Sequence, residues 1–207
     1  MARQTTLSAR EIVTFDDAPP PAGASGWVGG YAPGTNVKVV APDPAWPQHY
    51  ERLATLIRAA LGYRALALQH VGSTAVPDLP AKPLIDIDLT VADPNDEQAY
   101  VPVLEHCGFV LTVREPWWYR HRCLRHPDPA CNLHVFGPDC AEVERHRIFR
   151  DWLRSHPEDR ALYARTKTVS AEHTNLAGGH VMDYNARKQA VVREIYARAF
   201  RALGLPA

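Results

Sequence analysis

The sequence has no excess of charge of either sign, few cysteines and no long apolar run. Lysine and arginine together number 23, as do aspartate and glutamate, so the formal net charge is +0. A balanced chain has no overall electrostatic attraction to nucleic acid or to an anionic membrane, and we expect neither as a partner. No apolar run approaches the roughly 20 residues that a membrane span requires, and the first residues lack the apolar stretch of a secretory signal.

The few cysteines show no C-x-x-C spacing, which a cysteine-based metal site or redox pair usually has. They are Cys107, Cys123, Cys131 and Cys140. Histidines such as His70, His121 and His173 also lack the spacing of a zinc site. We therefore expect reduced thiols, no structural zinc and a cytoplasmic location.

A chain of 207 residues with 46% hydrophobic content is enough for one domain with a sizeable core. Residues 1–36 differ from the rest, because residues 16–26 are rich in proline, glycine and alanine and have no periodicity. We predict an extended or mobile N-terminal arm over 1–36, which Trp27 and Tyr31 can dock, and a separate domain over 37–207. We expect a chain that starts at Asn36 to fold without the arm.

The periodicity of residues 37–207 predicts an α+β fold, a mixed β-sheet flanked by helices with a C-terminal helical part. The expected strands cover 37–40, 65–71, 84–91, 109–113, 119–124 and 132–136. The expected helices cover 46–61, 96–106, 141–154, 157 to about 170, and the residues after 183. Asp43, Ser155 and Asp183 are the expected caps, and residues 172–183 form a loop long enough to act as a lid.

The strand expected over 84–91 carries two aspartates at alternate positions, Asp86 and Asp88, between apolar neighbours. Alternate residues of a strand share a face, so the two carboxylates should project side by side. Such a pair favours a hard divalent cation, Mg²⁺ or Mn²⁺, although salt-bridged surface carboxylates are the alternative. Upstream, Gly72 permits close approach of a phosphate and Ser73 offers a hydroxyl, unless the two form an ordinary turn.

The string His-Val-Gly-Ser-Thr-Ala-Val-Pro at 70–77, followed by Ile-Asp-Ile-Asp at 85–88, resembles the GrpB family within the nucleotidyltransferase superfamily. The resemblance extends from about residue 37 to about 200 and includes Asn-Leu-His-Val-Phe at 132–136 and Tyr-Asn-Ala-Arg-Lys at 184–188. It implies a nucleotidyltransferase-like sheet and a metal-dependent transfer of a nucleotidyl group from a nucleoside triphosphate to an unknown small-molecule acceptor. Asp78 stands where the family often has glycine.

The resemblance also assigns roles to residues. Asp86, Asp88 and His134 become the catalytic and metal-binding residues, with Gly72 and Ser73 on the phosphates. Active nucleotidyltransferases commonly place a third carboxylate on the strand that here offers Asn132 and His134. His134 can therefore ligate a metal, act as a base, bind a phosphate or simply be a hydrogen-bonded core histidine. Two further functions stay open, an accessory nucleotide-binding domain of the kind fused to dephospho-CoA kinase, and a different metal-assisted reaction in the same cleft.

Further basic residues are candidates for binding phosphate, with solvated surface charge as the alternative for each. They are Lys82, Arg120, Arg122, Arg125, Lys167 and Lys188. Lys167 and Lys188 each follow a tyrosine by four residues, which resembles helical basic positions of the family and is also the spacing of ordinary helix surface pairs. Trp117, Trp118 and Tyr119 can stack on a base or pack at the rim of the core.

Overall fold

A computed structural model describes residues 6–206, in which five strands form one mixed sheet in the order β1–β2–β5–β4–β3. The strands are β1 (Ala67–Val71), β2 (Ile85–Thr90), β3 (Val110–Glu115), β4 (His121–Pro127) and β5 (Ala130–Phe136). The central pair β2 and β5 is parallel, and the other neighbouring strands are antiparallel. The prediction of an α+β fold with a mixed sheet is confirmed.

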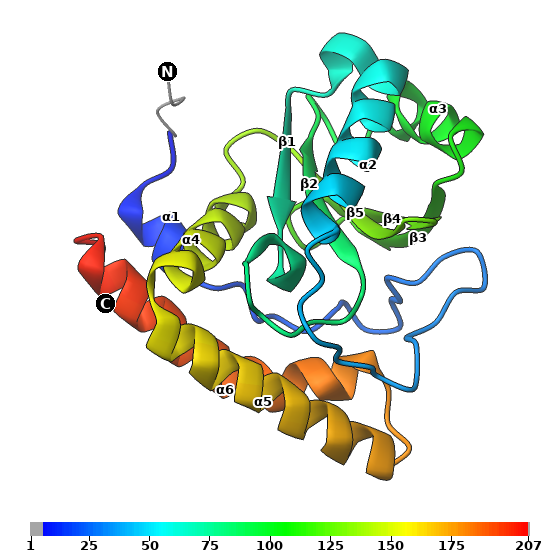
Figure 1. Ribbon diagram of the computed structural model, residues 1–207. Coiled ribbons are helices and arrows are strands. Elements are labelled where there is room, and N and C mark those ends of the chain that lie inside the picture. The colour runs from blue at the N-terminus through cyan, green and yellow to red at the C-terminus, as the bar shows by residue number, and fades with distance from the viewer. Residues whose placement is uncertain (1–5, 207) are drawn as a thin grey trace.

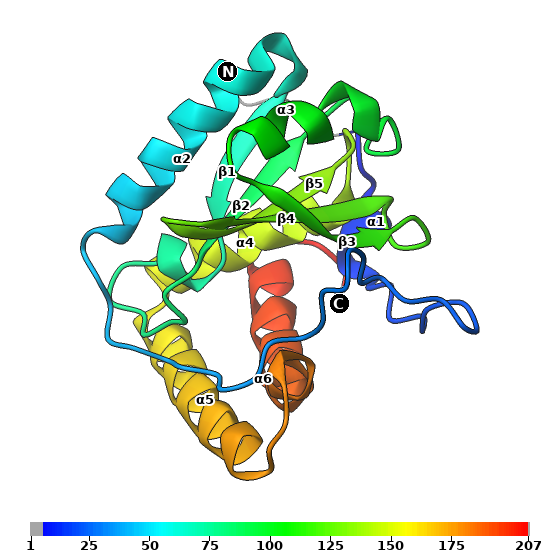
Figure 2. The same ribbon diagram turned by 90° about the vertical axis from the view of Figure 1, so that its right-hand side faces the viewer.

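One face of this sheet is apolar. Ile85, Ile87 and Leu89 of β2 and the alternate residues Leu133 and Val135 of β5 are fully buried in the main core. Two helices, α2 (Trp46–Leu61) and α3 (Val101–His106), pack against them and cover this face (Figure 2). The described residues also form three short 3₁₀ helices, η1 (Gly62–Arg64), η2 (Ser73–Ala75) and η3 (Glu97–Ala99).

The other face of the sheet carries Asp86 and Asp88 of β2 and the paired Asn132 and His134 of β5. It is turned toward the C-terminal helices (Figures 1 and 2). These are α4 (Ala141–Ser155), α5 (Pro157–Leu176) and α6 (Val181–Ala202). α5 and α6 pack side by side as a hairpin, and α4 joins them to the sheet. The open space between the polar face and this hairpin is where the candidate site lies.

Several boundaries differ from the prediction. No strand forms over 37–40, where Val40 makes only a single bridge with Ala81. The backbone of Val37 instead forms two hydrogen bonds with the side chain of Asn175, which accepts from its N–H and donates to its C=O. The lid predicted over 172–183 is wrong, because α5 continues to Leu176 and buries Thr174, which leaves a short turn over 177–180.

The three predicted caps are also wrong. Asp43 accepts the N–H of Ala45 ahead of α2, so its carboxylate is not the cap of that helix. α5 follows His156, without a side-chain cap, and the hydroxyl of Ser155 is bonded to carbonyls of α4. His180 caps α6, with Asp183 as the third residue of the reciprocal capping box.

The N-terminal arm is packed against the body rather than extended throughout. It contains a short helix, α1 (Ala9–Val13), whose Ser8 and Glu11 form a capping box. Ile12 is buried in a cluster with Ile148, Tyr196 and Phe200. This cluster ties the arm to α4 and α6 (Figure 1).

A fully buried arginine fixes the same junction. Arg145 of α4 donates to the backbone carbonyls of Glu11, Ile12 and Thr14 at 3.0 to 3.2 Å, and its side chain has no solvent exposure. Whether residues 37–207 fold alone remains a prediction. The main core holds no arm residue, so we still expect a folded body, with lower stability once these contacts are lost.

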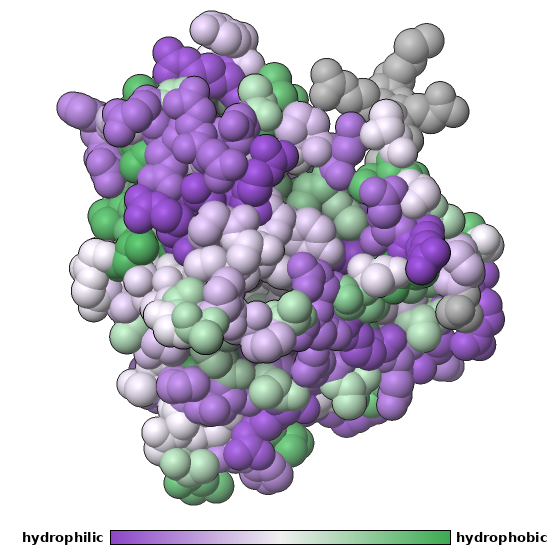
Figure 3. All heavy atoms as spheres, turned by 180° about the vertical axis from the view of Figure 1, so that it is seen from behind, coloured by the Kyte–Doolittle hydropathy of each residue, from purple (hydrophilic) through white to green (hydrophobic). Residues whose placement is uncertain are grey.

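Among residues 6–206, no helix combines the length and apolar character needed to cross a membrane. All four cysteines are free thiols. On the face seen in Figure 3, hydrophobic residues occur in small groups between hydrophilic ones.

We expect Ile12→Ala to lower the free energy of unfolding by about 2–4 kcal/mol, because it leaves a cavity in a cluster shared with α4 and α6. Arg10→Ala, on the exposed side of the same short helix, is the control and should change it by less than about 0.5 kcal/mol. Urea unfolding of both variants measures the difference. Equal effects would mean that the arm does not contribute to the stability of the body.

Candidate functional site

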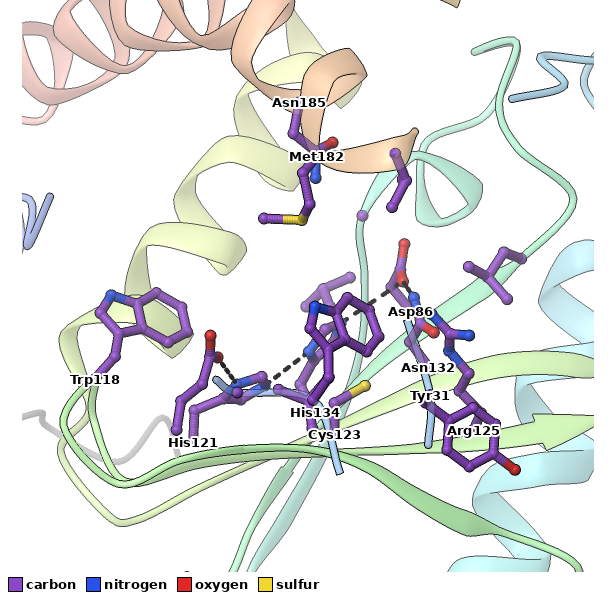
Figure 4. Close-up of a pocket in the computed structure, with 18 of the residues that line it drawn as sticks. Tyr31, Asp86, Trp118, His121, Cys123, Arg125, Asn132, His134, Met182 and Asn185 are labelled. Carbon is purple, nitrogen blue, oxygen red and sulfur yellow. Dashed lines mark hydrogen bonds and ion pairs between the residues drawn. The ribbon is translucent and has the colours of Figure 1, made fainter. Parts of the chain in front are cut away.

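A cleft of about 1310 Å³ opens between the polar face of the sheet, the Gly72–Ser73 turn, the α5–α6 hairpin and the arm. Figure 4 shows its floor, with Asp86, Asn132 and His134 near the centre and Met182 and Asn185 of α6 opposite. Asp16, Trp27 and Tyr31 of the arm also line it. The predicted Trp117 and Trp118 lie at its wall, whereas Tyr119 does not line it and bonds to Arg145.

Asp86 lies at the centre because parallel pairing aligns β2 with β5 so that Asp86 faces Asn132 and Asp88 faces His134. The amide of Asn132 donates to Asp86 Oδ1 at 3.0 Å, and His134 Nε2 is 3.7 Å from that oxygen. Burial by itself raises the pKa of Asp86, but His134, Lys82 and Asn132 outweigh it and hold the pKa below its ordinary value. Asp86 is therefore an ionised carboxylate that faces the cleft.

The turn at Gly72 is shaped around this carboxylate. Gly72 has a positive φ of 66°, and a Cβ at this position would lie 2.5 Å from Asp86 Oδ2. No other residue type fits there without displacing Asp86. Ser73 follows at the start of η2 and also lines the cleft, so the predicted Gly-Ser pair does lie beside the first aspartate.

Asp88 shares the face of Asp86 but is deeper, with 1% of the residue exposed. Its Oδ2 accepts from His146 Nδ1 at 2.9 Å, and His146 Nε2 lies 3.3 Å from Glu142. Burial lowers the pKa of His146, but the two carboxylates reverse this and raise the pKa to about 10. Asp88 Oδ1 has no hydrogen-bond partner in the described part of the chain, which is a costly arrangement for a buried carboxylate.

His146 and Glu142 were missed by sequence reasoning. Their i,i+4 spacing on a helix is common, and nothing local indicates that this helix face meets the strand that carries Asp88.

His134 belongs to a hydrogen-bonded series of side chains. Its Nδ1 lies 3.0 Å from His121 Nε2, and His121 Nδ1 lies 2.8 Å from Glu115 (Figure 4). Burial lowers the pKa of His121 to about 4, with the charge of His134 acting in the same direction, so this ring is neutral. A neutral His121 that donates to Glu115 must accept from His134, which leaves His134 Nε2 as the ring atom directed to Asp86.

Three lysines from distant parts of the sequence meet on the helix side of the cleft. Lys188 lies 4.4 Å from the ring centroid of Tyr184, Lys167 lies 4.8 Å from that of Tyr163, and Lys82 lies 5.9 Å from that of Tyr184. Lys167 and Lys188 both line the cleft, and each also contacts the tyrosine four residues before it on its own helix.

The lysine cluster, Lys82, Lys167 and Lys188, has no carboxylate oxygen of residues 6–206 within the 4.0 Å of an ion pair. Lys167 is almost fully buried and donates to the carbonyl of Pro80. Burial, together with the charges of Lys188 and Lys82, lowers the pKa of Lys167 to about 7, and Asp86 opposes this shift. Burial also lowers the pKa of Lys82. Such a group of ammonium ions is suited to a polyanion.

Two of the predicted phosphate ligands are not in the cleft. Arg122 is buried on the opposite side of β4, where it bonds to Glu97 at 2.6 Å. Arg120 is half-exposed and pairs with Asp93 at 3.2 Å. Alternate residues of β4, His121, Cys123 and Arg125, line the cleft instead.

In residues 6–206 no cluster of three or more histidine, cysteine, aspartate or glutamate side chains is arranged as a metal site. Mg²⁺ commonly binds through one or two carboxylates and completes its coordination with water and substrate phosphates. Asp86 lines the cleft and can offer such a carboxylate, whereas Asp88 lies on the same face of β2 but is buried and does not line the cleft, although its Oδ1 has no partner in the described residues. The two carboxylates do not fit a closed site made wholly of protein ligands.

Comparison with known proteins identifies relatives of this chain. A family profile described as GrpB protein matches residues 36–198. The UPF0157 protein BH1888 of Halalkalibacterium halodurans is 46% identical over 79% of this chain and 83% of its own length. The UPF0157 protein PA4798 of Pseudomonas aeruginosa is 39% identical over 82% of this chain and 70% of its own length.

One further relative carries a different name, and another has a solved structure. A protein named dephospho-CoA kinase, from Mycolicibacterium paratuberculosis, is 33% identical over 79% of this chain, and the match spans 46% of that protein. The crystal structure of conserved protein GrpB from Enterococcus faecalis superposes with a TM-score of 0.70 at 27% identity. The superposed part covers 80% of this chain and 99% of the Enterococcus faecalis chain.

The buried ammonium group of Lys167 should affect how the stability of the unliganded chain depends on pH. The pKa of Lys167 is lower in the folded chain than in the unfolded chain, so the unfolded state binds more protons between about pH 7 and 10. The contribution of Lys167 to the free energy of unfolding should therefore rise as the pH rises through that range.

We expect Lys167→Met to raise the melting temperature at pH 7 and to reduce this rise with pH. Lys38→Met, at an exposed lysine outside the cleft, is the matched control and should change neither. Thermal unfolding from pH 7 to 9.5 checks both variants. A Lys167→Met protein that is less stable at pH 7 would show that its ammonium group is a stabilising structural contact.

Proposed function

The chain belongs to the GrpB family, and from this membership and the cleft we propose that it binds a nucleoside triphosphate and transfers a nucleotidyl group to a small-molecule acceptor. The proposal makes it a nucleotidyltransferase-like transferase that acts in the cytoplasm. The observation that carries it is the lysine cluster, whose ammonium groups have no carboxylate partner at ion-pair distance in the described part of the chain and lie across the cleft from Asp86.

The triphosphate is the ligand that best fits this distribution of charge. Three ammonium groups together offset most of the charge of a triphosphate, and Ser73, in the turn beside Asp86, lines the same cleft with a hydroxyl that can donate to a phosphate oxygen. Tyr163 and Tyr184 hold the ammonium groups of Lys167 and Lys188 in place by cation–π contact, which does not use their N–H groups. Lys167 donates one of its N–H groups to the carbonyl of Pro80 and keeps the others for phosphate oxygens.

Mg²⁺ or Mn²⁺ is the proposed cofactor, held by Asp86 and by the free Oδ1 of Asp88. When bound, it would neutralise charge on the phosphoryl oxygens during transfer. His146 fixes the other oxygen of Asp88, so the carboxylate presents a defined lone pair.

His134 has the geometry to act on the phosphoryl group itself. Its Nδ1 is occupied by His121, which Glu115 orients in turn, so His134 Nε2 stays directed to Asp86 and the cleft. From that position a protonated His134 can hold a phosphoryl oxygen or relay a proton, and it can contribute to holding a cation once it has lost that proton.

A second function has an observation in its favour. Asn132 and His134 occupy the strand that in active nucleotidyltransferases commonly provides a third carboxylate, so this chain can bind a nucleotide without transferring it. The match to part of a protein named dephospho-CoA kinase is compatible with such an accessory role. A different metal-assisted reaction that uses His134 is the third possibility. Release of pyrophosphate from a triphosphate in the presence of acceptor extracts distinguishes transfer from binding alone.

We expect Asp86→Asn to weaken binding of ATP about 10-fold or more when Mg²⁺ is present and by less than about 3-fold in EDTA, because it removes a cation ligand rather than a phosphate ligand. Asp88→Asn should act in the same direction. Asp93→Asn, at an aspartate that pairs with Arg120, is the matched control and should leave both affinities unchanged.

Calorimetric titration of the intact chain measures these affinities. If ATP binds the native chain equally well with Mg²⁺ and with EDTA, and both aspartate variants behave as the control does, the proposed cation site is wrong. Thermal unfolding of each variant verifies that it is folded.

A further inference from the structure

We propose that the arm side of the cleft binds the acceptor through an acidic group: Arg125 holds a carboxylate or phosphate, and Trp27 and Tyr31 contact the flat body that carries it. The inference rests on the proposed function, because it assigns a chemical class to the acceptor of that reaction. It concerns a part of the cleft that the triphosphate does not require.

The register of the sheet places Arg125 relative to Asp86. Asp86 of β2 is paired with Asn132 of β5, and Asn132 is paired with Arg125 of β4. These three residues form one row across the strands, and neighbouring strands are about 4.8 Å apart, so the backbones of Asp86 and Arg125 are separated by about 10 Å. That distance leaves room for a small molecule between the guanidinium and the proposed point of transfer.

The guanidinium of Arg125 forms no ion pair with the described residues, and its contact in the fold is with the ring of Trp27. The two arginines on the far side of β3 and β4, Arg114 and Arg122, both bond to Glu97. Arg125 has no carboxylate of residues 6–206 within ion-pair distance, and it lines the cleft. A planar guanidinium without a protein partner can bind a carboxylate or phosphate through two parallel hydrogen bonds.

An aromatic wall stands beside this guanidinium. The ring centroid of Trp27 is 5.4 Å from the Arg125 guanidinium carbon. Figure 4 shows Tyr31 on the same side of the cleft as Arg125. A flat ligand that binds the fork of Arg125 can therefore also contact an indole and a phenol ring.

Backbone hydrogen bonds hold this wall in position. The carbonyl of Gly26 accepts from Arg114 N at 2.7 Å, and the N–H of Val28 donates to Thr112 O at 3.1 Å. These bonds place Trp27 opposite Val113 at the edge of the sheet, as one more antiparallel position beyond β3. Because paired residues share a face, the side chain of Trp27 is directed to the cleft without a need for ligand to order it.

The wall also comes from outside the region that defines the family. The GrpB profile begins at residue 36, whereas Trp27 and Tyr31 precede it. The lysine cluster lies within the matched region, on the helix side of the cleft. The proposed triphosphate site is thus formed by residues within the range that the family profile matches. The proposed acceptor site also uses Trp27 and Tyr31 of the arm, which lie outside that range.

Ligand-observed NMR titrations of the full chain with benzoate, phenyl phosphate and benzamide test the proposal. Benzoate and phenyl phosphate carry the two possible acids on the same ring, and benzamide has the same shape without charge. The variants are Arg125→Gln, Arg125→Lys and Trp27→Ala, with Arg120→Gln as the control because Arg120 lies outside the cleft. Calorimetry with ATP and Mg²⁺ is carried out on the same proteins.

We expect at least one acid to bind the native chain about fivefold or more tightly than benzamide, and whichever acid binds better identifies the group. Arg125→Gln should remove this preference, and Arg125→Lys should weaken it by keeping the charge without the fork. Trp27→Ala should weaken the binding of all three compounds. The affinity for ATP should change by less than about twofold in every variant.

The proposal is overturned if neither acid is preferred over benzamide, or if Arg125→Gln behaves as Arg120→Gln does. It is also overturned if Arg125→Gln or Trp27→Ala weakens the binding of ATP as much as the binding of the acid, since that side of the cleft would then hold the nucleotide. Failure of ATP to bind the native chain contradicts the proposed function, and the benzoate and phenyl phosphate titrations still decide whether an acid binds at Arg125.

Discussion

The alternation of side chains along β2 and β5 gives the central sheet one apolar and one polar face, and the other elements are arranged around that difference. The apolar face takes α2 and α3 and forms the main core. The polar face holds Asp86, Asp88, Asn132 and His134 in register, which would be costly beneath a packed helix layer. α4 covers Asp88 with a histidine, while the α5–α6 hairpin stands away from Asp86 and leaves the cleft open.

The same cleft concentrates positive charge that the fold does not neutralise. Keeping Lys167 buried beside Lys82 and Lys188 costs stability, as the lowered pKa of Lys167 indicates. A polyanion that binds there offsets this cost, because a ligand that binds only the folded state stabilises it. This cost is the reason for which we propose a binding role for the lysine cluster, because a purely structural cluster would be expected to include a carboxylate.

The sequence was sufficient to predict the five strands that form the sheet, with an extra one over 37–40, and the place of the two aspartates on β2, because strand alternation and the Gly-Ser turn are local patterns. It could not decide which arginines of β4 face the cleft, since predicted strand ends are uncertain by a few residues and a shift of one residue exchanges the faces. Arg122 was expected at the phosphates and lies on the opposite face, while Arg125 faces the cleft.

Contacts between segments that are distant in the sequence could not be predicted either. His146 reaches Asp88, and Arg145 reaches the arm, through packing that leaves no periodic signal in either segment. The prediction of an extended or mobile arm rests on the proline and glycine content of residues 16–26, which gives no information on the short capped helix over Ala9–Val13 that precedes them.

A crystal structure of the chain with Mg²⁺ and a non-hydrolysable ATP analogue tests the central claim most directly. The account predicts phosphate oxygens within hydrogen-bond distance of the ammonium groups of Lys82 and Lys188, with the α-phosphate on the side of Asp86. A triphosphate bound elsewhere on the molecule, or a cleft that stays empty at saturating analogue, would contradict it.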